Sequence, residues 1–336
     1  MTIKDIAKES GYAVGTVSRV LNNSCNVSPA ARAKILAVIE QHNYQPNSNA
    51  KHLKQQNNDG LALIVSGIQN MLFADILEKM QAILEKRGYN FTVCYADEKT
   101  DEIAEAERIC AEFKPRGIAF LGPSPQKFTP ALAELQLPCL LVTNSAAALN
   151  IPNLSSVSVD DVAASARMVE HLYGLGHRKI GLIGGDPENS WASRNRLCGF
   201  RDAAAHLGLP FDMQKQYAYA DFSLQGGYAA MEYLLEHCPD VTAVFAMSDL
   251  MALGAIRALN DRGLRVPQDI SVSGYDGIML GQYSNPRLTT ICQNAAQLAQ
   301  CGTEILLNGI EKHSAAVHET VPFELIAGES TAKCCF

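Results

Sequence analysis

A short polar face near the N-terminus carries side chains that can hydrogen-bond DNA. Between residues 14 and 22, apolar residues recur at helical spacing, so they face inward and the polar residues point outward. Arginine, serine and threonine side chains suit the base edges of the DNA major groove. The inward residues are Val17, Val20 and Leu21, and the outward residues are Thr16, Ser18, Arg19 and Asn22.

The elements around this face predict a helix-turn-helix. Thr2 to Asp5 fits a capping box, and the helix it opens precedes a turn at Gly11-Tyr12-Ala13. A third helix opens at Ser28-Pro29, because serine is a good N-cap and proline suits the first helical position. Two short helices around a glycine-containing turn are typical of this DNA-binding motif, although any small helical bundle would give the same pattern. The third helix is expected to pack on the others through Ile35, Leu36, Val38 and Ile39.

A basic segment and a polar linker follow this bundle. Residues 48–54 are long enough for one or two helical turns, which are not stable alone in water. One interpretation is a frayed linker with a stray leucine. The other is a helix that forms only on DNA, with Lys51 and Lys54 on phosphates and Leu53 wedged between base steps.

Charge is unevenly distributed along the 336 residues. Residues 1–58 carry 7 basic and 3 acidic residues, a net charge of +4, against −7 for the whole chain and therefore −11 for the remainder. Such asymmetry favours a polyanionic partner for the basic segment, with ordinary fluctuation as the alternative. No apolar run reaches the ~18 residues of a membrane span, and the start lacks a signal-peptide pattern. We therefore expect a cytoplasmic protein without a membrane partner.

From Gly60 onward, apolar strands alternate with amphipathic helices. This alternation predicts two doubly wound parallel sheets with helices on both faces, and a ligand at the carboxyl ends of the strands, between the halves. Strands are expected at 61–65, 91–95, 117–121, 139–143, 179–183, 242–246 and 270–275. Helices are expected at 73–87, 103–113, 130–137, 162–174, 194–207 and 250–262.

Enzymatic motifs are missing from the sequence. It contains no Gly-x-Gly-x-x-Gly after a strand, no phosphate-binding loop and no Gly-x-Ser-x-Gly elbow. The 10 cysteines are scattered without a Cys-x-x-Cys pair, which gives zinc or dithiol chemistry no support. We therefore expect no catalytic residues, no metal and no cofactor.

The stretch from Thr2 to Lys54 resembles the DNA-binding headpiece of the LacI/GalR family of bacterial transcriptional regulators. The matching motifs are Thr-Ile-Lys-Asp-Ile-Ala, Thr-Val-Ser-Arg-Val-Leu-Asn, Val-Ser-Pro and Asn-Tyr-x-Pro-Asn…Ala-Lys-x-Leu. Ala13 departs from the pattern, because the family usually has a capping serine there. The resemblance implies that Val14, Gly15 and Arg19 read bases and that Leu53 opens the central base step. The full expected DNA-binding set is Val14, Gly15, Thr16, Ser18, Arg19, Asn22, Asn47, Ala50, Lys51, Leu53 and Lys54.

The rest of the chain resembles the family's effector domain, which is similar to periplasmic sugar-binding proteins. Matching motifs include Leu-Gly-His-Arg-Lys-Ile at 175–180, Ser-Asp at 248–249 and Gly-Tyr-Asp at 274–276. The resemblance implies that Arg196 and Asp276 hydrogen-bond the effector, and a guanidinium and a carboxylate suit sugar hydroxyls or a purine edge. The expected effector-binding residues are Phe73, Asn144, Trp191, Arg196, Phe222, Ser248 and Asp276.

These observations together predict a transcriptional regulator, most simply a repressor, that binds a palindromic operator as a homodimer. Its effector is expected to be a sugar first, and a nucleoside or purine second. The predicted domains are a headpiece at 1–46, a hinge and linker at 47–58, an effector and dimerisation domain at 59–331, and a tail at 332–336. One effector subdomain combines 59–158 with 292–316, and the other combines 159–291 with 317–331. The alternative is a sugar- or nucleoside-sensing protein that does not read DNA.

Overall fold

A computed structural model describes residues 3–21, 27–42, 60–67, 70–96 and 101–334. The chain divides into two compact units, Met1–Asn57 and Asn58–Phe336. Several predicted DNA contacts lie outside the described residues and remain predictions: Asn22, Asn47, Ala50, Lys51, Leu53 and Lys54. The side chain of Ser18 and the capping residue Thr2 also lie outside.

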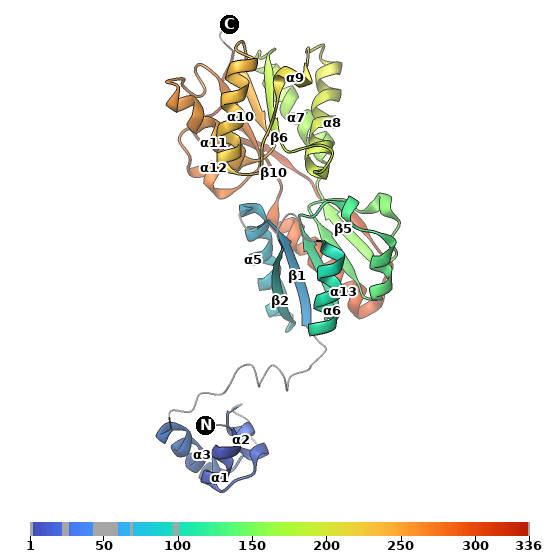
Figure 1. Cartoon of the computed structure of the whole chain (residues 1–336), viewed down its shortest axis with the longest axis vertical. Helices are drawn as coiled ribbons and strands as arrows, with labels where there is room; N and C mark the ends of the chain where they lie inside the picture. The colour runs from blue at the N-terminus through green and yellow to red at the C-terminus, as the bar shows by residue number, and fades with distance from the viewer. Residues whose placement is uncertain (1–2, 22–26, 43–59, 68–69, 97–100, 335–336) are drawn as a thin grey trace. The chain divides into compact units, whose positions relative to one another are not determined.

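The described residues of the first unit form a bundle of three helices, α1 (Ile3–Ser10), α2 (Val14–Leu21) and α3 (Pro29–Gln41) (Figure 1). Gly11 takes a left-handed φ of +75° in the turn between α1 and α2, which confirms the helix-turn-helix. The α3 helix starts as predicted, with the Ala31 amide donating to Ser28 Oγ over 3.4 Å. The buried core of the bundle consists of Ile6, Ala7, Val17, Val20, Ile35 and Val38.

The predicted inward position of Leu36 is wrong, because its side chain is 45% exposed. Ile35, Val38 and Ile39 lie on one stripe at the i, i+3, i+4 spacing of a helix, and all three contact the core. Leu36 follows Ile35 by one residue, which turns it by about 100° away from that stripe.

Sheet A of the second unit has six parallel strands in the order β11-β5-β4-β3-β1-β2. Alternate residues of β1 enter two different cores: Leu63 packs with α5 and α13, and Ile64 packs with α6. The strands are β1 (Gly60–Ser66), β2 (Asn90–Ala96), β3 (Gly117–Leu121), β4 (Cys139–Val142), β5 (Leu154–Ser158) and β11 (His318–Thr320). The α-helices are α5 (Met71–Lys86), α6 (Glu102–Phe113) and α13 (Ala295–Lys312), and the short 3-10 helices are Pro125–Lys127, Pro130–Leu135 and Ala147–Leu149.

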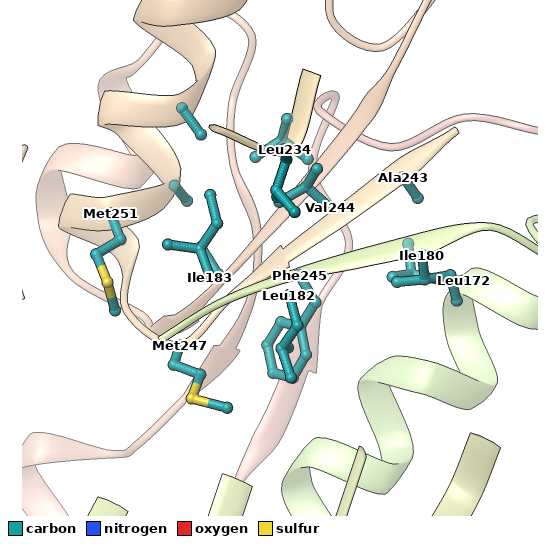
Figure 2. Packing of buried hydrophobic residues seen from close by; sticks show 14 of the residues in the cluster. Leu172, Ile180, Leu182, Ile183, Leu234, Ala243, Val244, Phe245, Met247 and Met251 are labelled. Carbon is teal, nitrogen blue, oxygen red and sulfur yellow. The ribbon is translucent and has the colours of Figure 1, made fainter. Parts of the chain in front are cut away.

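Sheet B has the order β12-β10-β9-β8-β6-β7 and is parallel except where β12 pairs with β10. Its core packs side chains from neighbouring strands: Leu182 and Phe245 are register partners and lie together in Figure 2. The strands are β6 (Ile180–Gly184), β7 (Tyr217–Tyr219), β8 (Ala243–Ala246), β9 (Ser271–Asp276), β10 (Thr289–Cys292) and β12 (Glu324–Ile326). The helices are α7 (Asp161–Gly174), α8 (Trp191–His206), α9 (Met213–Gln216), α10 (Leu224–His237), α11 (Asp249–Asp261) and α12 (Met279–Tyr283).

The chain passes between the two sheets after β5, after β10 and between β11 and β12. The structure differs from the predicted boundary at residue 317, because β11 pairs with β5 and so extends sheet A. None of the helices in the described ranges is long and apolar enough to cross a bilayer.

Helix α10 has no counterpart among the predicted elements. Its sequence contains Gly226 and Gly227, and two adjacent glycines within an apolar stretch indicate a turn instead of a helix. A Cβ on Gly227 would come within 2.1 Å of the Met251 carbonyl oxygen, and one on Gly254 equally close to the Leu224 carbonyl oxygen. These glycines therefore allow α10 and α11 to pack with their backbones in contact.

The α2 helix starts without a side-chain cap, which generates a test. Ala13 supplies only its carbonyl oxygen, which accepts from the amides of Thr16 and Val17 over 2.8 and 3.2 Å. We expect Ala13→Ser to stabilise the helix by about 1 kcal/mol, since the hydroxyl accepts an orphan amide. Hydrogen exchange of the α2 amides in the full chain measures this gain as slower exchange.

Ala37→Ser is the matched control, since Ala37 is exposed in the interior of α3. A serine there caps nothing and is expected to destabilise α3 slightly. Equal exchange rates in the Ala13→Ser protein and the parent would contradict the capping argument.

Candidate functional site

The candidate DNA-reading surface is the exposed side of α2. Gly15 and Arg19 are exposed, and Thr16 is half-buried. Val14 is also half-buried and packs against the core of the bundle. Gly15 adds no side chain to this side of α2, so the backbone can come close to DNA there, and Arg19 supplies a guanidinium for base edges. Both features suit a helix that enters a major groove.

The candidate effector site centres on Arg196, which is 5% exposed in α8. Its Nε donates to Asp161 Oδ1 over 2.9 Å, its Nη1 donates to the Met247 carbonyl oxygen over 2.5 Å, and Nη1 lies 3.8 Å from Asp276 Oδ1. The guanidinium carbon lies 3.6 Å from the ring centroid of Tyr275. Burial acts to lower the pKa of Arg196, but the carboxylates of Asp161 and Asp276 raise it overall, so the side chain stays charged.

Asp276 ends β9 with a left-handed φ of +113°. Its Oδ1 accepts a 2.7 Å hydrogen bond from Nε2 of Gln293, which lies in the crossover between β10 and α13. Burial raises the pKa of Asp276 to about 6, although Arg196 and Gln293 both act to lower it. The carboxylate is thus ionised at neutral pH at a cost to the fold.

A second buried carboxylate, Asp249, begins α11. Its oxygens accept from Thr290 Oγ1 over 2.6 Å and from the Ile278 amide over 2.8 Å. Burial, followed by the charge of Asp276, raises the pKa of Asp249 well above its ordinary value. The neighbouring Ser248 caps α11, since its Oγ accepts from the Met251 amide over 3.2 Å.

The other predicted effector residues lie at the same ends of the two sheets. Asn144 follows β4 and donates to the carbonyl oxygens of Gly122 and Pro123, over 3.3 and 3.0 Å. The ring of Phe73, in the first turn of α5, contacts Gly122, where a Cβ would come within 2.3 Å of it. Both residues therefore belong to the carboxyl edge of sheet A.

Phe222 and Trp191 lie on the sheet B side. A Cβ on Gly185 would come within 2.9 Å of both the Phe222 ring and Ser193 Oγ, which places these two side chains together after β6. Trp191 opens α8, is half-buried and has the Arg194 guanidinium 6.0 Å from its ring centroid.

One apolar cluster joins the carboxyl ends of the two sheets. Leu72 of α5 is buried with Ile278, which follows β9, and Phe73 and Leu250 pack against the same cluster. Residues from the edge of sheet B thus contact residues from the edge of sheet A, as the prediction of a site between the halves requires.

Several polar residues of the candidate effector site are not among those that the sequence predicts. Asp249 and Tyr275 lie within motifs that resemble the family, but the sequence alone suggested no role for either. Asp161 begins α7 shortly after β5 ends at Ser158, a position that could have identified it. Gln293 lies between β10 and α13, so no repeating pattern of apolar residues points to it. Among the described residues, no group of three or more His, Cys, Asp and Glu side chains is arranged to hold a metal ion.

Two protein families each match part of one unit of the chain. Residues 2–47 match the family described as "Bacterial regulatory proteins, lacI family", and residues 169–331 match the "Periplasmic binding protein-like domain". The HTH-type transcriptional regulator MalR of Clostridium butyricum is 31% identical over 98% of this chain and 99% of its own length.

Two solved structures are similar over nearly the whole chain. One is the transcriptional regulator CelR in complex with cellobiose, with 30% identity and a TM-score of 0.71 over 98% of this chain and 99% of that one. The other is the Lac repressor dimer bound to operator and the anti-inducer ONPF, with 27% identity and a TM-score of 0.75 over 99% of each chain. The similarity to MalR extends over both units and is therefore not confined to the residues that match the lacI family.

The raised pKa of Asp276 predicts a pH-dependent gain from Asp276→Asn. A carboxyl whose folded pKa lies near 6 rather than about 4 makes the unfolding free energy fall as pH rises from about 4 to 6. Asparagine tolerates the positive φ and carries no charge. We therefore expect the variant to be more stable by about 2–3 kcal/mol above pH 7, and the gain to vanish near pH 4.

Urea unfolding at several pH values measures this difference, with Asp202→Asn as a control at an exposed aspartate. The control is expected to show no comparable gain between pH 5 and 7. A destabilised Asp276→Asn protein at pH 7.5 would show that the buried carboxylate supports the fold instead of straining it.

Proposed function

Because this chain belongs to the LacI family of bacterial transcriptional regulators, we propose that it represses transcription from a palindromic operator under control of a small-molecule effector. The proposal rests on the presence of two sites in one chain. One is the exposed side of helix α2, and the other is the buried Arg196–Asp276 pair where the carboxyl ends of the two sheets meet. A regulator of operator DNA acts in the bacterial cytoplasm.

Operator reading is assigned to α2, with Arg19, Gly15 and Val14 toward the bases and Thr16 and Ser18 toward the phosphates. Arg19 has the exposure that a base contact needs. Outside the described residues, Asn22, Asn47, Ala50, Lys51 and Lys54 are proposed to contact the backbone and groove. Leu53 is proposed to enter the minor groove as an apolar wedge.

The effector proposed for the second unit is a sugar, with a nucleoside or purine as the next candidate. Arg196, Asp276, Asn144 and Ser248 supply polar groups, and Phe73, Trp191 and Phe222 supply rings that stack on a sugar face. The structure of a similar regulator with cellobiose supports this assignment. Binding of the effector changes the angle between the subdomains, and a coupling of about 1–3 kcal/mol is enough to control operator binding.

A homodimer is proposed because a single reading helix makes few contacts, and a similar repressor is a dimer on its operator. Helix α12 presents a strongly apolar surface for this contact, with Met279 65%, Leu280 42% and Tyr283 82% exposed. Tyr95 of β2 is 57% exposed, and Leu224 of α10 is 44% exposed. The three exposed apolar side chains of α12 lie within five residues, and such clustering suits a protein–protein contact.

Selection of genomic fragments by the purified protein, followed by titration at defined salt, tests operator reading. We expect Arg19→Ala to weaken specific binding by about 1–3 kcal/mol and non-specific binding much less. Lys8→Ala is the matched control, because it removes one exposed positive charge from α1. Equal losses of specific affinity in both variants, or no preferred fragment, would argue against groove reading by α2.

Dimerisation through α12 predicts that Tyr283→Asp lowers the molecular mass in solution toward that of a monomer. The reason is that a charge buried in an apolar contact lacks a partner. Light scattering after gel filtration provides the measurement. Tyr219→Asp serves as control, because Tyr219 is 62% exposed on β7, at the far edge of sheet B. An unchanged mass for Tyr283→Asp would exclude α12 as an essential contact.

A further inference from the structure

Exposed cations gather at the edge of sheet A where its strands begin. The strands are parallel, so their amino ends lie together, and the helices that connect them end at the same edge. The cations of this basic edge are Lys86 and Arg87 at the end of α5, Lys114 and Arg116 between α6 and β3, and Lys312 at the end of α13. Arg116 is half-buried, and the other four are exposed.

Contacts between neighbouring elements make the basic edge one continuous surface. The Arg116 amide donates to the carbonyl oxygen of Gly60, the first residue of β1, over 2.8 Å, and its guanidinium carbon lies 6.0 Å from the Tyr89 ring centroid. The Tyr89 hydroxyl donates to Glu311 Oε1 over 2.7 Å, which brings the end of α13 to the same place. That hydrogen bond raises the pKa of Tyr89, while the charges of Arg116 and Arg87 act to lower it, so both guanidinium groups lie near this hydroxyl.

The basic edge lacks carboxylate partners. Among the described residues, no ion pair joins any of its four exposed cations to a carboxylate. Glu85, Glu134 and Glu311 lie at the same edge, and Glu112 is paired with Arg108, so five cations and three carboxylates leave a net charge of +2 in the described part of this edge. Residues 59–336 as a whole carry −11, so this positive edge stands out in an acidic unit.

The amino edge of sheet B provides an internal comparison, because its cations have carboxylate partners. The helix dipole favours cations at helix C-termini, which accounts for their position at both edges but not for the missing partners at the basic edge. Arg178 of sheet B donates to the carbonyl oxygens of Tyr173 and His177. The ion pairs there are Lys179–Asp240 at 3.1 Å, Arg262–Glu232 at 2.9 Å, Arg265–Asp269 at 2.9 Å and Arg287–Glu329 at 2.8 Å.

The length of the chain limits how far the basic edge can lie from DNA in the proposed complex. Gly60 begins β1 and follows Leu53, the proposed minor-groove residue, by seven residues. Seven fully extended residues span at most about 25 Å. A duplex carries one negative charge per roughly 1.7 Å of its axis, so many phosphates on either side of the central base step fall within that distance.

We propose that the basic edge of sheet A is a second DNA-binding surface, which contacts phosphates of the duplex close to the central base step of the operator. This inference rests on the proposed operator binding. Phosphate contacts carry no sequence information directly, so the surface adds affinity and salt dependence without adding specificity. The unit that binds the effector then holds DNA through its own charges as well as through the hinge.

A triple variant of the full chain, Arg87→Gln with Lys114→Gln and Lys312→Gln, tests the proposal. Each phosphate contact contributes about 0.9 to the slope of the logarithm of affinity against the logarithm of salt concentration. We therefore expect the slope to become shallower by about 2 to 3, with specific and non-specific binding weakened alike. Titration of a selected fragment and of an unrelated fragment, each at several salt concentrations, provides the measurement.

The matched control removes the same charge from the amino edge of sheet B, with Lys179→Gln, Arg265→Gln and Arg287→Gln. Its slope is expected to stay that of the parent, and melting temperatures show whether both variants remain folded. An unchanged slope in the first variant, or an equal change in both variants, would overturn the proposal.

Glu85→Gln tests the same surface in the opposite direction. It removes an exposed negative charge beside Lys86 and Arg87. We expect both fragments to bind about twofold more tightly at low salt, with the gain lost at high salt where charges are screened. Unchanged or weaker binding at low salt would count against a DNA contact at this edge.

The same titrations separate this inference from the function on which it rests. A parent protein that selects no fragment contradicts operator reading, and the slopes on unrelated DNA then still test the basic edge. A parent protein that selects a fragment, with a triple variant of equal salt dependence, contradicts only the second DNA-binding surface.

Discussion

A buried guanidinium is the constraint around which the effector domain is organised. Removing an arginine from water costs several kcal/mol unless its donors are paired. The partners of Arg196 come from separate places in the chain: Asp161 at the start of α7, the Met247 carbonyl after β8, and the Asp276 carboxylate and Tyr275 ring of β9. Sheet B must place the ends of these elements together for the charge to be tolerated. The same requirement gathers a cluster of polar side chains at the carboxyl edge of the sheet, where doubly wound folds bind their ligands.

This polar cluster is hydrogen-bonded to the segments that join the two sheets. Asp276 accepts from Gln293 in the crossover after β10, and Asp249 accepts from Thr290 within β10 itself. In the proposed account, a ligand that engages Asp276 therefore acts, through the hydrogen bond from Gln293, on a connection between subdomains and not only on one surface. The unfavourable ionisation of Asp276 is consistent with this role, because sites that bind ligands often keep charges that do not favour the free fold.

The sequence predicts correctly those helices and strands whose apolar residues recur with a clear local period. The stripe of Val17 and Val20 defines α2, and the unbroken apolar run of β3 gives its bounds as observed. Helix α10 escaped prediction because its glycines serve a contact with α11 that local periodicity does not show. Arg196 and Asp276 came from family motifs, whereas Gln293 and Asp161 act through partners 17 and 35 residues away in the chain, beyond any local pattern.

The central claim is that one ligand at the Arg196–Asp276 cluster and one operator at α2 control each other's binding. Thermodynamic linkage makes this claim quantitative, since the factor by which the ligand changes operator affinity must equal the factor by which the operator changes ligand affinity. The decisive measurement is operator affinity across a titration of the compound that stabilises the protein most among sugars, nucleosides and purines, with the reciprocal titration in parallel. The account predicts equal factors of about 5 to 150 in the two directions. An operator affinity that stays constant while the compound saturates the protein would contradict it.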